Sequence, residues 1–270
     1  MVKVLGTDGS EAGELDLPVQ FRERIRPDII KKAVLSAQSR RRQAYGSDER
    51  SGLQHVTHWK KRSRAYRGIR GKSYPSSRTP RKITMRRGSQ MSGPGGEAPQ
   101  AVGGRKAHPP KAEKDFSKDI NDKERRKGIR SAIAATMDRE AVESRGHEVG
   151  DAELPLVVSD EVEGFEDTSE VVKLLEELGL EDELERVEER EERSGKGKNR
   201  GRRKREKTGP LLVVGEDGGV SRAARNIPGV EVARVEELNA EVLAPGTEPG
   251  RLTVWTENAV EKLGEEDMFR

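Results

Sequence analysis

A stretch of 47 residues without a single acidic side chain, residues 50–96, limits what this chain can fold into. It contains 13 Lys or Arg, 7 Gly, 7 Ser and 3 Pro, and its few apolar residues repeat with neither a helical nor a strand period. Such a segment cannot bury enough apolar surface to offset the entropy lost on ordering it, so its order must come from a partner. If it leaves a folded body and returns, it can reach roughly 70–80 Å, at about 3.3 Å per residue.

Positive charge is sorted into two segments of the chain. Residues 40–111 carry 19 Lys or Arg against 3 Asp or Glu, and residues 195–207 carry 8 against 1. The rest of the chain holds 25 against 45, so a formal net charge of only +3 conceals a strongly divided molecule. This division predicts a polyanionic partner for the two basic segments.

Several classes of protein are disfavoured by what the sequence lacks. There is no cysteine, which excludes disulfides and thiolate metal sites. The longest apolar runs, LPLVV and PLLVV, are too short to cross a bilayer, and the N-terminus has no signal-peptide pattern. The histidines are His55, His58, His108 and His147. His55 and His58 lie close in sequence, but no acidic residue or cysteine lies near them to complete a metal site. We therefore expect a soluble, intracellular and cytoplasmic protein without a metal or a membrane partner.

The remaining sequence alternates between strand and helix patterns. Strands are predicted at 154–159, 210–215, 230–235 and 251–255, and helices from Pro27, from Asn121 to Ala135, over 167–178, and near 180–193, 220–226 and 256–264. Asn121 with Glu124, and Asp167 with Glu170, resemble helix caps, and Gly179 is a helix stop. The pattern predicts an α/β fold: a single globular domain with a mostly parallel sheet flanked by helices, plus a long extended basic internal loop. We place the body at 1–44 and 108–270, the loop at 45–107, and a second basic loop at 194–209.

Residues 59–88 have the composition of a segment that binds nucleic acid. Lys and Arg pair with phosphates, and Trp59, Tyr66 and Tyr74 can stack on unpaired bases, as can the guanidinium groups of Arg64 and Arg67. A solvated tail that binds nothing is the alternative, but such tails are usually terminal and poor in aromatic residues. The second basic stretch, SGKGKNRGRRKREKTG, lacks the P-loop pattern and is better interpreted as a loop that contacts an RNA backbone.

Sites for enzymatic chemistry are not recognisable. The acidic run at 180–193 is interpreted as a solvated helix face, with one apolar edge formed by Leu180, Leu184 and Val187. The turn GEDGGVSRAARN at 215–226 follows a strand, but Glu216 and Asp217 would repel a nucleotide phosphate. No nucleophile-elbow, zincin or dinucleotide-binding motif is present. We expect no catalytic residue, no cofactor and no small-molecule substrate.

The archaeal branch of the L-four family of large-subunit ribosomal proteins resembles this chain in a series of segments that keep the same order. They read LPVQFRERIRPDIIKKAV, GGRKAHPPKAEKDFSKDINDKERRKGIRSAIAAT, RGHEV, ELPLVVSDEVE, SGKGKNRGRRKREKTGPLLVV, ARNIPGVEV and LAPGTEPGRLTVWTENAVEKL. The chain departs from the family in the middle of the basic loop, where WKKRSRAYRGIRGKSYPSSR replaces a glycine- and arginine-rich pattern of the type GxGxxxARxxR.

The resemblance implies a structural constituent of the large ribosomal subunit that binds ribosomal RNA and supports its assembly. It also implies that the loop at about 45–107 lines the nascent-peptide exit tunnel, with the nascent peptide and neighbouring ribosomal proteins as further partners. The side chains expected to bind RNA are Arg40, Arg41, Arg42, Trp59, Lys60, Lys61, Arg62, Arg64, Tyr66, Arg67, Arg70, Lys72, Tyr74, Arg78, Arg81, Lys82, Arg86, Arg87, Arg105, Lys106, His108, Lys111, Lys196, Lys198, Arg200, Arg202, Arg203, Lys204 and Arg205.

Two alternatives from other functional classes stay open on the residues alone. One is an RNA-modifying enzyme with a nucleotide-binding α/β domain, which needs a cofactor-binding turn at the carboxyl end of a strand. The other is a general nucleic-acid chaperone, which would bind DNA and unrelated RNA as well as ribosomal RNA.

Overall fold

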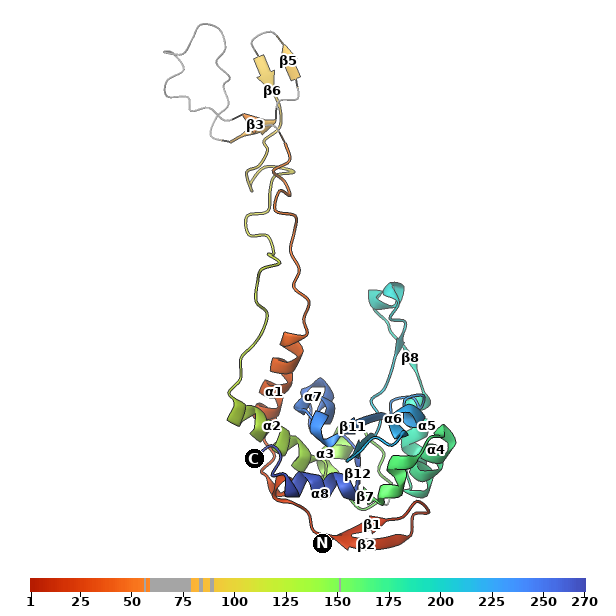
Figure 1. Ribbon diagram of the computed structural model, residues 1–270. Coiled ribbons are helices and arrows are strands. Elements are labelled where there is room, and N and C mark those ends of the chain that lie inside the picture. Colours follow the sequence, from red (N-terminus) through yellow and green to blue (C-terminus); the bar gives the residue numbers. More distant parts are fainter. Residues whose placement is uncertain (56, 59–78, 83–84, 88–89, 151) are drawn as a thin grey trace. The chain divides into compact units, whose positions relative to one another are not determined.

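The computed structural model of the chain (Figure 1) describes residues 1–55, 57–58, 79–82, 85–87, 90–150 and 152–270. These residues form two compact units. The first, which we call the body, comprises Met1–Arg41 and Ser117–Arg270, and the second, which we call the loop unit, comprises Arg42–Phe116. Among the described residues, no helix has both the length and the apolar character that crossing a membrane requires.

The body is built on a six-stranded sheet with the strand order β11-β10-β12-β7-β1-β2. The strands are β1 (Val2–Leu5), β2 (Glu11–Leu15), β7 (Leu156–Val158), β10 (Leu211–Val214), β11 (Glu231–Arg234) and β12 (Thr253–Thr256). All neighbouring pairs are parallel except β1 and β2, which are antiparallel. The predicted mostly parallel sheet is confirmed, and it contains two N-terminal strands, β1 and β2, that were not predicted.

Continuous apolar runs form the central strands because both faces of the sheet are covered. Leu211 and Val213 of β10 join one core cluster, and Leu212 and Val214 join the other. All four side chains are buried, as expected for a parallel strand between two helical layers.

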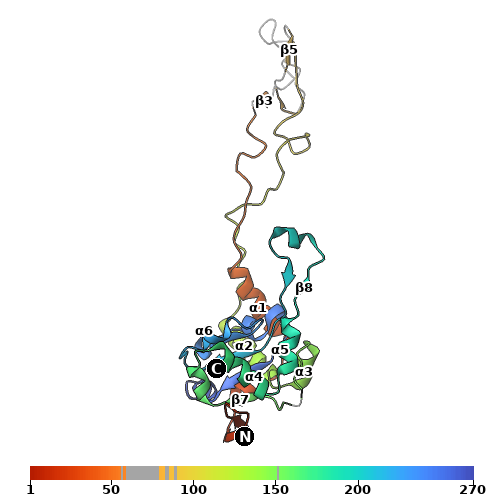
Figure 2. The ribbon, with the colours of Figure 1, turned by 90° about the vertical axis from the view of Figure 1, so that its right-hand side faces the viewer.

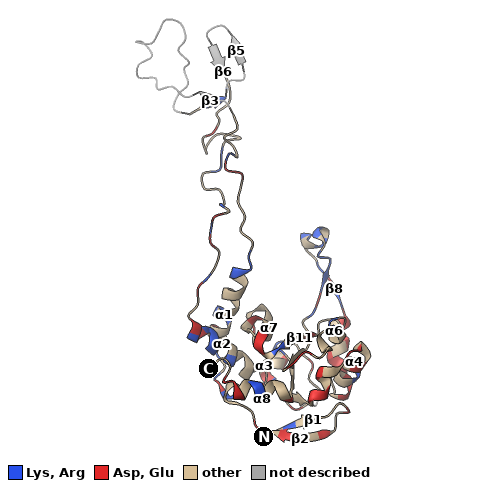
Figure 3. Cartoon of the chain, in the orientation of Figure 1, with Lys and Arg blue, Asp and Glu red and all other residues tan. Residues whose placement is uncertain are grey.

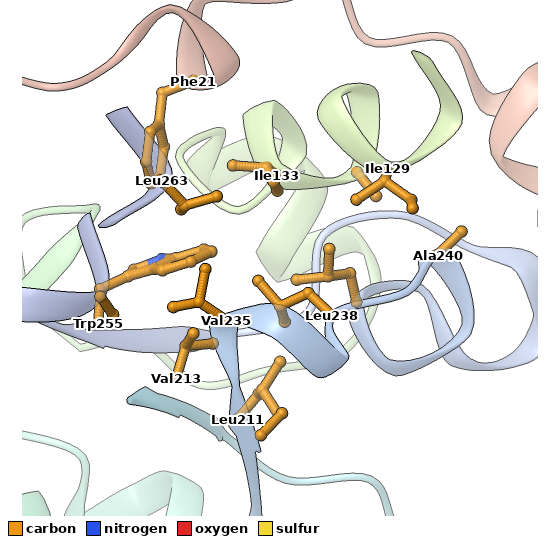
Figure 4. Packing of buried hydrophobic residues seen from close by; sticks show 14 of the residues in the cluster. Phe21, Ile129, Ile133, Leu211, Val213, Val235, Leu238, Ala240, Trp255 and Leu263 are labelled. Carbon is orange, nitrogen blue, oxygen red and sulfur yellow. The ribbon is translucent and has the colours of Figure 1, made fainter. Parts of the chain in front are cut away.

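Helices cover each face of the sheet. The helices are α1 (Pro27–Arg40), α2 (Asp122–Ala135), α3 (Arg139–Ser144), α4 (Thr168–Glu177), α5 (Glu181–Glu188), α6 (Val220–Ala224), α7 (Ala240–Leu243) and α8 (Glu257–Glu265). Residues of α1, α2, α7 and α8 belong to one core cluster, and residues of α3, α4, α5 and α6 pack in the other. The first cluster includes the fully buried Trp255, whose ring meets the ring of Phe21 edge to face at 5.1 Å (Figure 4).

The predicted helix ends are correct in position but not in the capping bonds. Asn121 and Asp167 occupy the N-cap positions of α2 and α4, yet neither side chain makes a capping hydrogen bond. Gly179 follows α4 with φ +75°, a backbone conformation that favours glycine, so the predicted stop is confirmed. The capping-box interpretation of Asn121 is therefore wrong.

The described part of the loop unit has little regular structure. Its strands are β3 (Thr57–His58), β4 (Arg81–Lys82), β5 (Met85–Arg87) and β6 (Gln90–Ser92), which pair as two short antiparallel ladders. The fold class is therefore the predicted one: an α/β body with a long basic internal loop.

Candidate nucleic-acid interface

The second basic segment forms a short hairpin on the body, which we call the basic hairpin (residues 191–205). Strands β8 (Glu191–Glu192) and β9 (Lys204–Arg205) pair antiparallel, and a 3-10 turn at Lys196–Arg200 forms the tip. Gly201 ends that turn with φ +80°. Figures 1 and 2, which view the hairpin from two directions, both show it standing out from the sheet and helices of the body.

Most cations of the basic hairpin have no partner among the residues that the structure describes. Arg203 forms an ion pair with Glu192 at 2.6 Å, so part of its charge is already neutralised. The other six predicted side chains are exposed, and they make no hydrogen bond or ion pair to any residue that the structure describes. They are Lys196, Lys198, Arg200, Arg202, Lys204 and Arg205. Cations held apart from protein carboxylates are available for the phosphates of an external partner.

The three consecutive arginines after α1 differ in their surroundings. Arg40 is exposed and has no partner among the described residues. Arg41 is paired with Glu241, so it is already engaged within the body. Arg42 belongs to the loop unit, where its guanidinium carbon lies 4.5 Å from the centroid of the Phe116 ring. The structure therefore separates three residues that the sequence presents as one cluster.

The loop unit holds the remaining predicted residues. Arg81 donates from Nη1 to the carbonyl of Gly93 at 3.3 Å, and Lys82 is half-buried in β4. Exposed positions without an ion pair to another described residue are Arg105, Lys106, His108 and Lys111. Arg86 and Arg87 lie in β5, but their side chains are outside the described part. The predictions that fall wholly outside the described residues are Trp59, Lys60, Lys61, Arg62, Arg64, Tyr66, Arg67, Arg70, Lys72, Tyr74 and Arg78.

A basic helical layer on the body was not predicted from the sequence, apart from Arg40 and Arg41 at the end of α1. Residues 22–41 and 117–130, which include α1 and α2, carry 13 Lys or Arg against 5 Asp or Glu. Figure 3 shows blue segments on α1 and α2 and red segments on α4. The missed signal was the run DKERRKGIR, in which interspersed acids conceal the excess of cations. Some of these cations are engaged locally, for example Arg130 with Glu23 at 2.9 Å.

A buried carboxylate fills the place where a doubly wound enzyme would bind a cofactor. Glu163 follows β7 and lies at the carboxyl ends of β10 and β12. Its Oε1 accepts hydrogen bonds from the backbone N–H of Gly215 (2.7 Å) and the hydroxyl of Thr256 (2.8 Å). Its Oε2 accepts from the backbone N–H of Glu216 and the amide of Asn258, both at 3.2 Å. The donors that could cradle a phosphate are thus occupied by a carboxylate of the chain itself.

The turn after β10 carries an ionised carboxylate, which disfavours a bound phosphate. Burial would raise the pKa of Asp217, but hydrogen bonds from Ser221 and from the backbone N–H of Gly219 outweigh it and lower that pKa. The carboxylate therefore stays ionised at the start of α6. A nucleotide-binding enzyme is disfavoured by this arrangement.

The interpretation of the acidic run at 180–193 as a solvated helix face is wrong at Glu183, which is buried. Its carboxylate is fully buried, receives two hydrogen bonds from Arg186 at 2.7 Å each, and lies 2.6 Å from Nδ1 of His147. Burial would raise the pKa of Glu183, but the hydrogen bonds from Arg186 and His147 lower it. Burial lowers the pKa of His147, because imidazolium would be desolvated beside a carboxylate that Arg186 already neutralises.

This buried cluster is structural in character. Arg186 also donates to the carbonyl of Thr208 at 2.7 Å, so the cluster ties α5 to the chain that leaves the basic hairpin. Among the residues the structure describes, no group of three His, Asp or Glu side chains could hold a metal ion.

Comparison with known proteins agrees with this geometry. Residues 15–266 match the family described as the ribosomal protein L4/L1 family. The sequence is 48% identical over 266 residues to the large ribosomal subunit protein uL4 of Halobacterium salinarum, covering 98% of this chain and 99% of that protein. It is 47% identical over 265 residues to the uL4 of Archaeoglobus fulgidus, covering 97% and 98% of the two chains. The corresponding protein of Methanococcoides burtonii is 45% identical over 268 residues, covering 98% of each.

Proposed function

Because this chain belongs to the ribosomal protein L4/L1 family, we propose that it is a structural component of the large ribosomal subunit and binds large-subunit ribosomal RNA. The family consists of structural ribosomal proteins, so the role of this protein is structural and not enzymatic, and its place is in the ribosome. The proposal rests chiefly on the basic hairpin, where six exposed cations have no partner among the described residues.

The body supports this function by the way its charge is distributed. Residues 160–193, with helices α4 and α5, carry 16 Asp or Glu against 4 Lys or Arg. The basic layer of α1 and α2 packs on the other face of the sheet. A polyanion is attracted to one face and repelled by the other, so the field of the body favours one orientation on RNA.

The extension at 45–107 is proposed to reach into the RNA and line the nascent-peptide exit tunnel. Its composition supports this role, because a segment rich in Lys, Arg and Gly can approach RNA closely and gains order from the surrounding phosphates. Neighbouring ribosomal proteins and the nascent peptide are the further partners in this proposal.

The role of the basic hairpin is tested by replacing Lys198, Arg200 and Arg202 together with Gln. Each lost phosphate contact removes about 0.7–0.9 from the slope of log K against log salt concentration, so the slope for binding to a large-subunit RNA transcript should fall by about 2–3. The matched control replaces Lys3, Arg139 and Lys173 with Gln, which removes the same charge from exposed positions outside the interface. The control slope should equal that of the wild type, and equal slopes for the two triple variants would contradict the proposal.

The chaperone alternative is distinguished by competition. Large-subunit RNA should displace labelled ribosomal RNA from the protein at concentrations where duplex DNA and an unrelated RNA of equal length do not. Equal displacement by all three competitors would favour a general chaperone.

A further inference from the structure

Two aromatic side chains that the sequence analysis did not single out stack on each other in the loop unit. The ring centroids of Tyr45 and Phe116 are 5.7 Å apart, and the ring planes differ by only 14°. The guanidinium group of Arg42 lies over the Phe116 ring at 4.5 Å, and the ammonium group of Lys114 lies over it at 5.4 Å. Cations over the Phe116 ring hold the pair in an electropositive setting.

Tyr45 offers an open ring face. It is 55% exposed although one of its faces is stacked on Phe116 and the guanidinium carbon of Arg42 lies 5.9 Å from its ring centroid, so much of the ring remains open to solvent. Among the large hydrophobic side chains that the structure describes as exposed, it is the only aromatic one. An exposed aromatic face in a chain with 3% aromatic residues is an unusual placement that a stacking ligand would explain.

A cationic groove lies beside the stacked pair. It has a volume of about 710 Å³, and both rings contribute to its wall. Its charged lining consists of Lys106, Lys111 and Lys114 with a single acid, Glu113. His108 also lines it, next to two prolines that stiffen the chain. The groove therefore combines phosphate-binding cations with a flat apolar surface.

We propose that the open face of Tyr45 stacks against an unpaired base of ribosomal RNA, while the lysines of the adjacent groove contact the phosphates on either side of that base. Single-stranded RNA fits this combination because every base has a flat π-face and every linkage carries a charge. An acidic peptide would use the lysines but not the ring. The inference rests on the proposed function, since it names the part of the RNA that this groove receives.

A purely structural role for the stack makes a different prediction. The chain segments on which the two rings lie are close together, with the backbone N–H of Ser47 donating to the carbonyl of Pro110 at 3.1 Å. If the rings only brace these segments, loss of Tyr45 would weaken binding to any polyanion, with or without bases. If Tyr45 binds a base, the loss depends on the base being present.

The test compares Tyr45→Phe and Tyr45→Leu in the full-length protein, with two RNA probes. One probe is a 12-nucleotide oligoadenylate, and the other is the same ribose-phosphate backbone without bases. Tyr45→Leu should weaken oligoadenylate binding roughly tenfold to a hundredfold and leave binding of the abasic probe unchanged. Tyr45→Phe, which keeps the ring, should bind both probes like the wild type. Lys111→Gln should lower the salt slope by about 0.7 on both probes.

The outcomes separate the possibilities. Equal weakening of both probes by Tyr45→Leu, or no weakening of either, would overturn the inference, and so would displacement of oligoadenylate by AMP at the same nucleotide concentration. If instead the proposed function is wrong, the wild-type protein itself should bind large-subunit RNA without any dependence on salt concentration. Crosslinking of Tyr45 to a base in assembled large subunits would support both the stacking of Tyr45 on RNA and the proposed function.

Discussion

Replacing the buried Glu163 with Gln should destabilise the body more than replacing any of the exposed Glu residues near it with Gln. The carboxylate is only 8% exposed and accepts four hydrogen bonds, two at each oxygen. In the Gln variant one of the two oxygens becomes an NH2 group, which is a donor facing donors. If the amide replaces Oε1, the Gly215 N–H keeps only its longer bond of 3.4 Å to Thr256 Oγ1. If the amide replaces Oε2, the Glu216 N–H loses the acceptor that it has among the described residues.

The magnitude follows from the bonds that change. An unsatisfied buried N–H costs about 1–3 kcal/mol, and each retained bond loses about 1 kcal/mol when the acceptor is no longer charged. With one unsatisfied N–H and two retained bonds, the free energy of unfolding should therefore fall by about 3–5 kcal/mol. The matched control is Glu161→Gln in the same 3-10 helix, where the carboxylate is exposed and makes no hydrogen bond to another described residue.

Urea unfolding of the RNA-free protein measures the difference. In a Trp59→Phe background, Trp255 is the only tryptophan, and its fully buried ring reports directly on the core of the body. Glu161→Gln should unfold within about 0.5 kcal/mol of its parent, as expected for surface substitutions. If Glu163→Gln unfolded at the same urea concentration as Glu161→Gln, the account of Glu163 as the acceptor that closes the strand ends would be refuted.

The remaining predictions concern the buried histidine and two glycines. The pKa of His147 lies below its ordinary 6.5, so the unfolded chain binds more protons as the pH falls through that value, and the free energy of unfolding should fall with it. His147→Asn keeps a donor for Glu183 but cannot titrate, so urea unfolding between pH 7.5 and 5.5 should show a flatter profile; parallel profiles would contradict the assignment. Gly146 and Gly250 share φ +91°, but a Cβ on Gly250 would lie 2.5 Å from the backbone of Ala141, whereas one on Gly146 meets nothing within 4 Å. Gly146→Ala should cost about 1–2 kcal/mol of strain, and Gly250→Ala about 1–3 kcal/mol more, measured by urea unfolding; equal losses would show that the contact yields without cost.

The central sheet was predictable because its strands are buried on both faces. The runs LPLVV and PLLVV can bury all their apolar side chains only in a strand that lies between two helical layers. The segment of chain that separates the two runs is long enough to hold a helix. The edge strands were not predictable in the same way. β2 reads EAGEL and exposes four of its five residues, so it has no apolar period, and it becomes a strand only because β1 supplies backbone hydrogen bonds.

The candidate interface was predictable to the extent that charge alone marks it. The basic hairpin was found because its cations are contiguous and lack acidic neighbours. Glu183 was misinterpreted because its partner His147 is 36 residues away, and no local pattern distinguishes a buried carboxylate from its exposed neighbours on the same helix. The Tyr45–Phe116 pair was missed for the same reason, since the two rings are brought together only by the return of the loop.

Charge in this protein is divided twice, between the basic segments and the rest of the chain, and between the two helical layers of the body. The second division limits the orientations in which the basic segments can meet RNA. In the proposed function the basic hairpin supplies affinity for phosphate, but exposed cations alone would bind RNA in many orientations. The layer of α4 and α5, with its excess of carboxylates on one side of the sheet, makes approach from that side unfavourable. The basic layer of α1 and α2 lies on the opposite face, so the orientation that brings it to RNA is the one in which the acidic layer faces away. If the proposed function is correct, specific docking of the body therefore depends on the acidic helices as well as on the basic segments.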